Sequence, residues 1–142
     1  MAAAPAVAEG PPDGPDADPR IVEMMDAVPG GVLVDANHAV WPALDMEMTV
    51  PGAHAGTTFT SVGACPGGRI CVFSGRSLTG PSLSWGSCGD HSIPSNFTAL
   101  SLANARSSGY AQARNGGSVF ATAYAGRWAN ILGAATYVRC VL

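Results

Sequence analysis

The chain has 142 residues, of which 12% are charged and 47% are hydrophobic, and it includes 18 Gly and 11 Pro. This length suits one domain, or a small domain with an extension, and the glycine and proline favour strands and turns over a coiled coil or long helical bundle. No apolar stretch approaches the roughly 18–20 residues that span a bilayer, so we expect no membrane span.

The formal net charge of -3 hides a division of the chain into two parts. Residues 1–63 carry nine acids and one arginine, whereas residues 64–142 carry one acid, six arginines and all four cysteines. Residues 1–17 are mostly Ala, Pro, Gly and acidic residues, which predicts a disordered tail because too little apolar surface is available for burial. We assign residues 18–63 to an acidic N-terminal arm with a linker, and residues 64–142 to a separate β-domain.

The N-terminal arm is predicted to contain one helix and a short hairpin. Asp18 and Pro19 favour a helix start, because aspartate caps free amides and proline has no amide to leave unpaired. Apolar residues then recur at helical spacing until a Pro-Gly-Gly stop, and they form one stripe of Ile21, Met24, Met25 and Val28. Short strands are expected at 32–34, 39–41 and 46–50. The arm has too little core to fold alone, so we expect the stripe to dock on the rest of the chain.

Residues 64–142 have the composition of a small all-β domain with many turns. An Asn115-Gly116 pair between two alternating segments predicts a tight hairpin. Two similar units are indicated when 71–85 is aligned with 112–126 at an offset of 41, which places Leu83 on Tyr124. A shift of about three residues then places Leu100 on Val138. The strands are expected at 71–75, 83–85, 100–103, 110–114, 118–123 and 136–142.

The four cysteines predict two disulfides, in three alternative pairings. The close spacing of the first two favours Cys65–Cys71 and Cys88–Cys140. Zinc is a weaker interpretation because there is no CxxC pair and the three histidines, His38, His54 and His91, are scattered. We therefore expect no metal site and no cofactor.

Two segments carry the resemblance of this chain to a known family. Residues 65–80, CPGGRICVFSGRSLTG, resemble the start of the Streptomyces metalloproteinase inhibitor family of small secreted proteins, and within them Phe73-x4-Leu78-x-Gly80 resembles the βγ-crystallin Greek-key signature. The same signature fits again at Val119-x4-Tyr124-x-Gly126, which gives a repeat offset of 46 that competes with the offset of 41. The resemblance implies a βγ-crystallin-like sandwich of two Greek-key motifs in a secreted actinobacterial protein. The family's reactive loop is closed by its own cysteine pair, which the second half lacks, so no residue is assigned to that site.

No catalytic residues are predicted, and we expect the protein not to be an enzyme. The β-domain has one acid and one histidine, Asp90 and His91, whose side chains would point away from each other on a strand, and there is no nucleophile elbow. Calcium-binding loops near Asp90–Ser95 would need paired acids, which are absent from that segment. The arginines lack interleaved aromatic residues, so no nucleic-acid partner is expected.

The resemblance therefore implies a peptidase inhibitor-like binding module whose partner is an extracellular protease or another secreted protein. The candidate partner-binding loops are Asn115–Ser118, which includes Gly116 and Gly117, and Gly86–Pro94, which includes Asp90 and His91. One alternative is an extracellular structural protein that self-associates through the N-terminal arm. A further alternative is a secreted antimicrobial protein or toxin with a crystallin-like fold.

Overall fold

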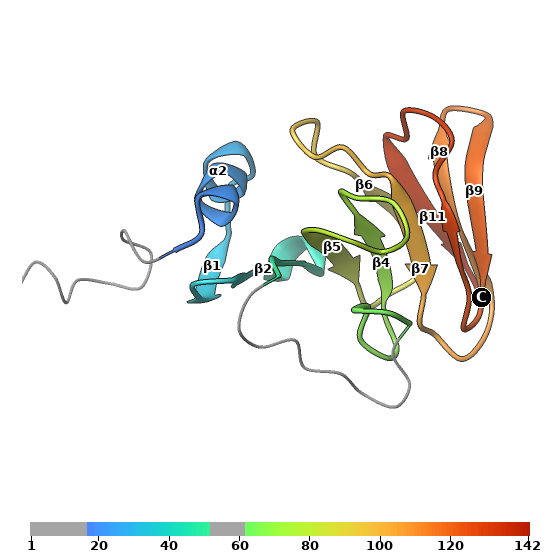
Figure 1. The fold of residues 1–142 in the computed structure, drawn as a ribbon, viewed down its shortest axis with the longest axis horizontal. Coiled ribbons are helices and arrows are strands. Elements are labelled where there is room, and N and C mark those ends of the chain that lie inside the picture. Colours follow the sequence, from blue (N-terminus) through green and yellow to red (C-terminus); the bar gives the residue numbers. More distant parts are fainter. Residues whose placement is uncertain (1–16, 52–61) are drawn as a thin grey trace, which may run out of the picture.

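The computed structural model describes residues 17–51 and 62–142, which form two antiparallel β-sheets and one α-helix (Figure 1). The all-β class is confirmed, whereas the predicted tail (apart from Ala17, which is buried) and most of the linker, with His54, lie outside the described residues. The larger sheet, sheet A, has the strand order β1-β2-β3-β5-β4-β7-β10, and the smaller, sheet C, has the order β6-β11-β8-β9. The elements are α2 (Pro19–Ala27), β1 (Val32–Asp35), β2 (His38–Trp41), the 3-10 helix η1 (Pro42–Leu44), β3 (Met46–Thr49), β4 (Ile70–Phe73), β5 (Ser82–Trp85), β6 (Gly89–Ser92), β7 (Ser101–Asn104), β8 (Tyr110–Asn115), β9 (Ser118–Tyr124), β10 (Trp128–Asn130) and β11 (Tyr137–Val141).

Helix α2 forms where the sequence predicts it. The Asp18 carboxylate accepts a hydrogen bond from the Arg20 amide at 2.9 Å, which caps the helix start. Ile21 and Met24 are buried in the main core, and Met25 and Val28 pack against it. The predicted docking of the apolar stripe on the rest of the chain is therefore confirmed.

The N-terminal arm also continues the larger sheet. Strand β3 pairs with β5 in register from Met46 opposite Trp85 to Thr49 opposite Ser82, and β2 and β1 follow in turn. Alternate residues of β2 and β3, such as Trp41, Met46 and Met48, are buried in the same core as α2. Seven strands thus share one layer, and the four-stranded sheet and α2 contribute to the opposite side of the main core.

The eight strands from β4 to β11 fall into two units of four with the same arrangement. The first unit is β4, β5, β6 and β7, and the second is β8, β9, β10 and β11. In sheet A the first unit supplies β5, β4 and β7, and the neighbouring strand β10 comes from the second unit. In sheet C the second unit supplies β9, β8 and β11, and the neighbouring strand β6 comes from the first. Each unit therefore gives its third strand to the other unit's sheet.

The strand pairing corrects the predicted repeat registers. The offset of 41 holds for the first strand of each unit, since it places the buried Val72 of β4 on Ala113 of β8. The cross-strand partners of these two residues determine how the second strands of the units align. Val72 pairs with Leu83 and Ala113 pairs with Ala121, so Leu83 corresponds to Ala121 (121 − 83 = 38), not to Tyr124. Leu102 in turn corresponds to Val138 (138 − 102 = 36), so the placement of Leu100 on Val138 was wrong. The competing offset of 46 was also wrong, because it aligns β4 with β9.

The offset changes because the first hairpin of each unit has a different connection. Residues 74–81 form a long loop between β4 and β5 that is held by Ser101 of β7. The buried Ser101 hydroxyl donates to the Gly75 carbonyl at 2.7 Å and accepts from the Leu78 amide at 2.9 Å. Strands β8 and β9 are instead joined by a two-residue turn. The hairpin is confirmed, but its turn residues are Gly116-Gly117 rather than the predicted Asn115-Gly116.

Both disulfides have the pairing that the cysteine spacing favoured. Cys65–Cys71 ties the segment that precedes β4 to that strand. The two cysteines form a second buried cluster with Phe73, and Leu78 of the 74–81 loop packs against this cluster. Cys88–Cys140 joins the start of β6 to β11, where Cys140 lies opposite Gly89 in the ladder. The second bridge therefore covalently links the two four-strand units at one of the exchanged strands.

Candidate functional site

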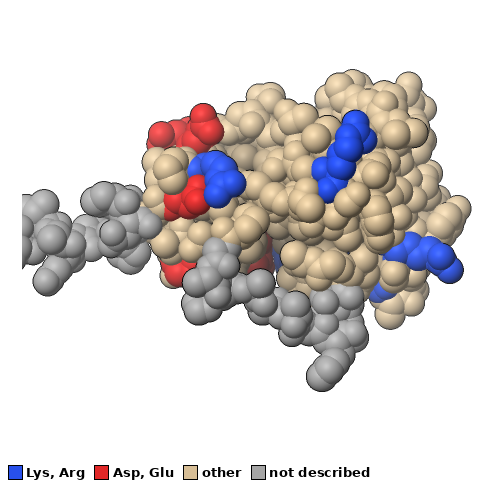
Figure 2. Space-filling view, viewed as in Figure 1, with Lys and Arg blue, Asp and Glu red and all other residues tan. Residues whose placement is uncertain are grey.

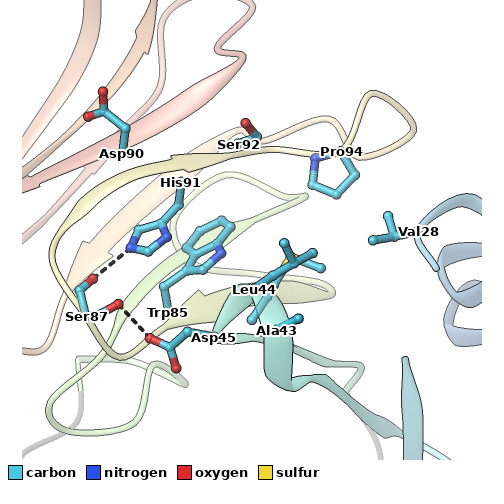
Figure 3. A pocket seen from close by; sticks show the side chains of 11 residues that line it. Val28, Ala43, Leu44, Asp45, Trp85, Ser87, Asp90, His91, Ser92 and Pro94 are labelled. Carbon is cyan, nitrogen blue, oxygen red and sulfur yellow. Dashed lines mark hydrogen bonds between the residues drawn. The ribbon is translucent and has the colours of Figure 1, made fainter. Parts of the chain in front are cut away.

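A cleft of about 580 Å³ opens between α2, η1 and the β6 segment (Figure 3). Its floor contains the buried side chains of Trp85 and Met46, and the apolar Val28, Leu44 and Pro94 line its walls. Its polar lining consists of Asp45, Ser87, Asp90, His91 and Ser92. A concave apolar site with a few converging polar groups is the usual form of a ligand pocket, so this cleft is the first candidate for binding.

Asp45 connects η1 to the turn that follows β5. It follows η1 in a left-handed conformation, with φ of 50°. Its Oδ2 accepts hydrogen bonds from the Gly86 amide at 3.0 Å and from the Ser87 hydroxyl at 2.8 Å. The carboxylate therefore fastens the N-terminal arm to the β5–β6 connection beside the cleft.

Asp90 and His91 point in opposite directions, as expected for neighbours on a strand (Figure 3). The His91 ring stacks on Trp85 with centroids 5.4 Å apart, and its Nε2 lies 2.8 Å from the Ser87 carbonyl oxygen. Asp90 instead pairs with Arg139 of β11 through two hydrogen bonds of 2.8 and 3.0 Å. The His91 ring thus contributes to the cleft floor, whereas the carboxylate of Asp90, although this residue also lines the cleft, is engaged with Arg139.

The carboxylates of Asp45 and Asp90 both favour the charged form. Partial burial of Asp45 opposes ionisation, but hydrogen bonds from Ser87 and Gly86 and the charge of Arg69 outweigh it and lower its pKa below the ordinary value. The hydrogen bonds from Arg139 lower the pKa of Asp90 in the same direction. The two groups are therefore anionic at neutral pH.

The polar groups of the cleft are engaged with one another rather than arranged for nucleophilic attack. The Ser87 hydroxyl donates to Asp45, and His91 contacts the Ser87 carbonyl rather than its hydroxyl. A catalytic serine needs its hydroxyl hydrogen-bonded to the histidine that takes its proton. Within residues 17–51 and 62–142, no three His, Cys, Asp or Glu side chains lie close enough together to hold a metal ion.

The structure revises the first candidate loop. Gly86–Pro94 was wrong as a loop, because Gly89–Ser92 forms β6, which pairs with β11 at the edge of sheet C. Asp90 and His91 nevertheless line the cleft, and the Gly86 amide binds Asp45 beside it. Sequence reasoning missed Asp45 and Trp85 as members of this site, whereas Ser87 lies within the predicted segment Gly86–Pro94. No local pattern indicates the two missed residues, since Asp45 reaches Ser87 across 42 residues.

The second candidate loop, Asn115–Ser118, contributes no residue to the cleft and forms the exposed tip of the β8–β9 hairpin. Two hydrogen bonds hold this tip, one to the first residue of β11 and one to the segment before that strand. The Tyr137 hydroxyl donates to the Gly116 carbonyl at 2.9 Å, and the Asn115 amide donates to the Ala134 carbonyl at 3.0 Å. The tip is therefore an exposed segment fixed on one side by its own domain.

Comparison with family models, with curated proteins and with solved structures finds no match for this chain. Two disulfides indicate an extracellular or otherwise oxidising environment. The described part of the chain contains no helix with the length and hydropathy needed to span a membrane.

Proposed function

We propose that this chain is an exported, non-catalytic binding module with a βγ-crystallin-like fold, and that it binds and inhibits a secreted metallopeptidase. The observation that carries the proposal is the exchange of third strands between the two four-strand units. Such a pair of units is the architecture implied by the resemblance of residues 65–80 to the metalloproteinase inhibitor family. The two disulfides support export, because such bridges persist in oxidising compartments.

The loop that carries the crystallin-like signature supports the same proposal. Phe73 begins the signature at the end of β4, and Gly80 ends it with a φ of +81°, a conformation that favours glycine. A side chain at Gly80 would also approach the Ser74 hydroxyl to 2.9 Å. The signature glycine is thus favoured by the backbone conformation, and a larger residue would also require the Ser74 side chain to move.

The β8–β9 tip is the segment that we assign to the peptidase contact. The Gly116 carbonyl accepts a hydrogen bond from Tyr137, and the Asn115 side chain donates one to Ala134. These bonds fix the conformation of the tip before any partner binds, which reduces the entropy lost on association. The Gly116-Gly117 turn carries no side chains, so its backbone is open to close approach. Val119, which follows the tip, is an exposed apolar residue that a partner could cover.

The test is an inhibition assay of the full chain against thermolysin-like and subtilisin-like peptidases. We expect slowed hydrolysis by the thermolysin-like enzyme at micromolar inhibitor, and an inhibition constant about five- to tenfold weaker for Asn115→Ala, because one positioning hydrogen bond is lost. Asn96→Ala, at an exposed asparagine of the β6–β7 loop with no side-chain hydrogen bond among the described residues, is the matched control. Full hydrolysis in the presence of excess wild-type protein would refute the peptidase proposal. Equal effects of the two variants would refute the assignment to the tip.

A further inference from the structure

The exposed apolar side chains of the described residues gather at two ends of the molecule. Those of the first group belong to α2, β1 and η1, and those of the second to the β9–β10 region and the C-terminus. The first group is Val22, Val32, Val34 and Leu44, and the second is Val119, Tyr124, Trp128, Leu132 and Leu142. Strands β1 and β10 are the two outermost strands of sheet A, so their side chains lie at opposite edges of one sheet.

The charges divide in the same way. Around β1 and α2, the acidic Glu23, Asp26 and Asp35 have no ion pair among the described residues. We call this region, with Val32 and Val34, the acidic end. On the face in Figure 2, acidic side chains gather over the α2 end, and only arginine is visible among the charged groups of the opposite half.

The opposite edge is basic. Arg127 directly precedes β10, and Arg76 is adjacent to Ser77, whose amide donates to Asn130 of β10 at 2.8 Å. Neither arginine has an ion pair among the described residues. We call these two arginines, with Trp128 and Leu132, the basic end. Each end therefore combines exposed apolar surface with charge of one sign that has no ion-pair partner in residues 17–51 and 62–142.

We propose that the acidic end of one copy binds the basic end of a second copy. Opposite charges would meet in this head-to-tail contact, whereas a symmetric contact of two acidic or two basic ends would bring like charges together. Val32 and Val34 are 54% and 52% exposed, and Trp128 and Leu132 are 46% and 80% exposed, so both surfaces have apolar area to bury. A head-to-tail contact repeats from copy to copy, so it forms chains or rings rather than closed dimers.

Side-chain packing rather than extension of sheet A would form most of this contact. Strand β10 has three residues, and β1 has an irregularity between Leu33 and Asp35, two features that limit pairing along an edge. The proposal goes beyond peptidase binding, because neither end includes the Asn115–Ser118 tip. Self-association through the apolar stripe of α2, in contrast, is disfavoured because Ile21 and Met24 are buried within their own chain.

The test is light scattering with size-exclusion chromatography and sedimentation of the full chain, from micromolar to millimolar concentration. At about 10 mM NaCl, where the Debye length is about 30 Å, we expect masses above that of a dimer that grow with concentration. At about 1 M NaCl, where it is about 3 Å, the association should weaken. A wild-type protein that stays monomeric at low salt, or that stops at a dimer, would overturn the proposal.

Two variants test the direction of the contact. Val32→Ser with Val34→Ser blocks the acidic end, and Trp128→Ser with Leu132→Ser blocks the basic end; each should weaken association at least about tenfold. An equal mixture of the two should recover a dimer and nothing larger, because each variant keeps one intact end. Ser95→Ala, at an exposed residue of neither end, should associate like the wild type. No recovery in the mixture, with both variants folded by circular dichroism, would refute head-to-tail binding.

Discussion

Removal of the Cys88–Cys140 bridge should destabilise the protein more than removal of Cys65–Cys71. The first bridge has a sequence separation of 52 and the second of 6. The chain-entropy treatment of the unfolded state gives about 4 kcal/mol for the long loop and about 2 kcal/mol for the short one. The long bridge also pins β6 of one four-strand unit to β11 of the other, so its loss should loosen the sandwich.

The measurement is urea unfolding of two double variants, Cys88→Ala with Cys140→Ala and Cys65→Ala with Cys71→Ala. The difference of about 2 kcal/mol should appear in the midpoints, with similar slopes showing that both variants expose similar surface on unfolding. In a thermal scan it corresponds to roughly 6–10 °C. Lost packing alone would make removal of Cys65–Cys71 the more destabilising change, because Cys65 and Cys71 are fully buried whereas Cys88 is partly exposed. An equal or larger loss from the short bridge would therefore refute the entropic argument.

Three further predictions follow from single side chains. Ser101→Ala should cost about 2 kcal/mol, because it removes two hydrogen bonds that hold the 74–81 loop; an unchanged melting temperature would show that the loop does not depend on them. Ile21→Ala should cost about 3 kcal/mol in chemical denaturation because this side chain is fully buried, whereas the exposed Val22→Ala should change little; similar losses would contradict the docking of α2. The lowered pKa of Asp45 means that its ion contributes stability above the ordinary value of 3.8 and loses that contribution as the pH falls below it. Asp45→Asn should thus be less stable than wild type at pH 7, with a gap in melting temperature that narrows below about pH 4, and a constant gap would refute this role.

Local sequence patterns predicted the elements whose determinants are close together in the chain. The Asp18 cap and the spacing of Ile21 and Met24 define α2 without reference to the rest of the molecule. The β8–β9 hairpin and the cysteine pairing also follow from short-range signals. The strands β6 and β10 were missed because they are short and rich in polar or small residues, so their pairing partners stabilise them rather than their own propensity.

Which strands are neighbours was decided only by tertiary structure. The sequence indicated two similar units, but the exchange of β6 and β10 between the sheets depends on partners 25 to 51 residues away. The same holds for the cleft, where Asp45 reaches Ser87 across 42 residues, and for the two charged ends, which lie at opposite edges because the arm adds its strands beside β5. Spacing in a sequence encodes periodicity along one element, whereas the order of strands in a sheet depends on which buried faces pack together.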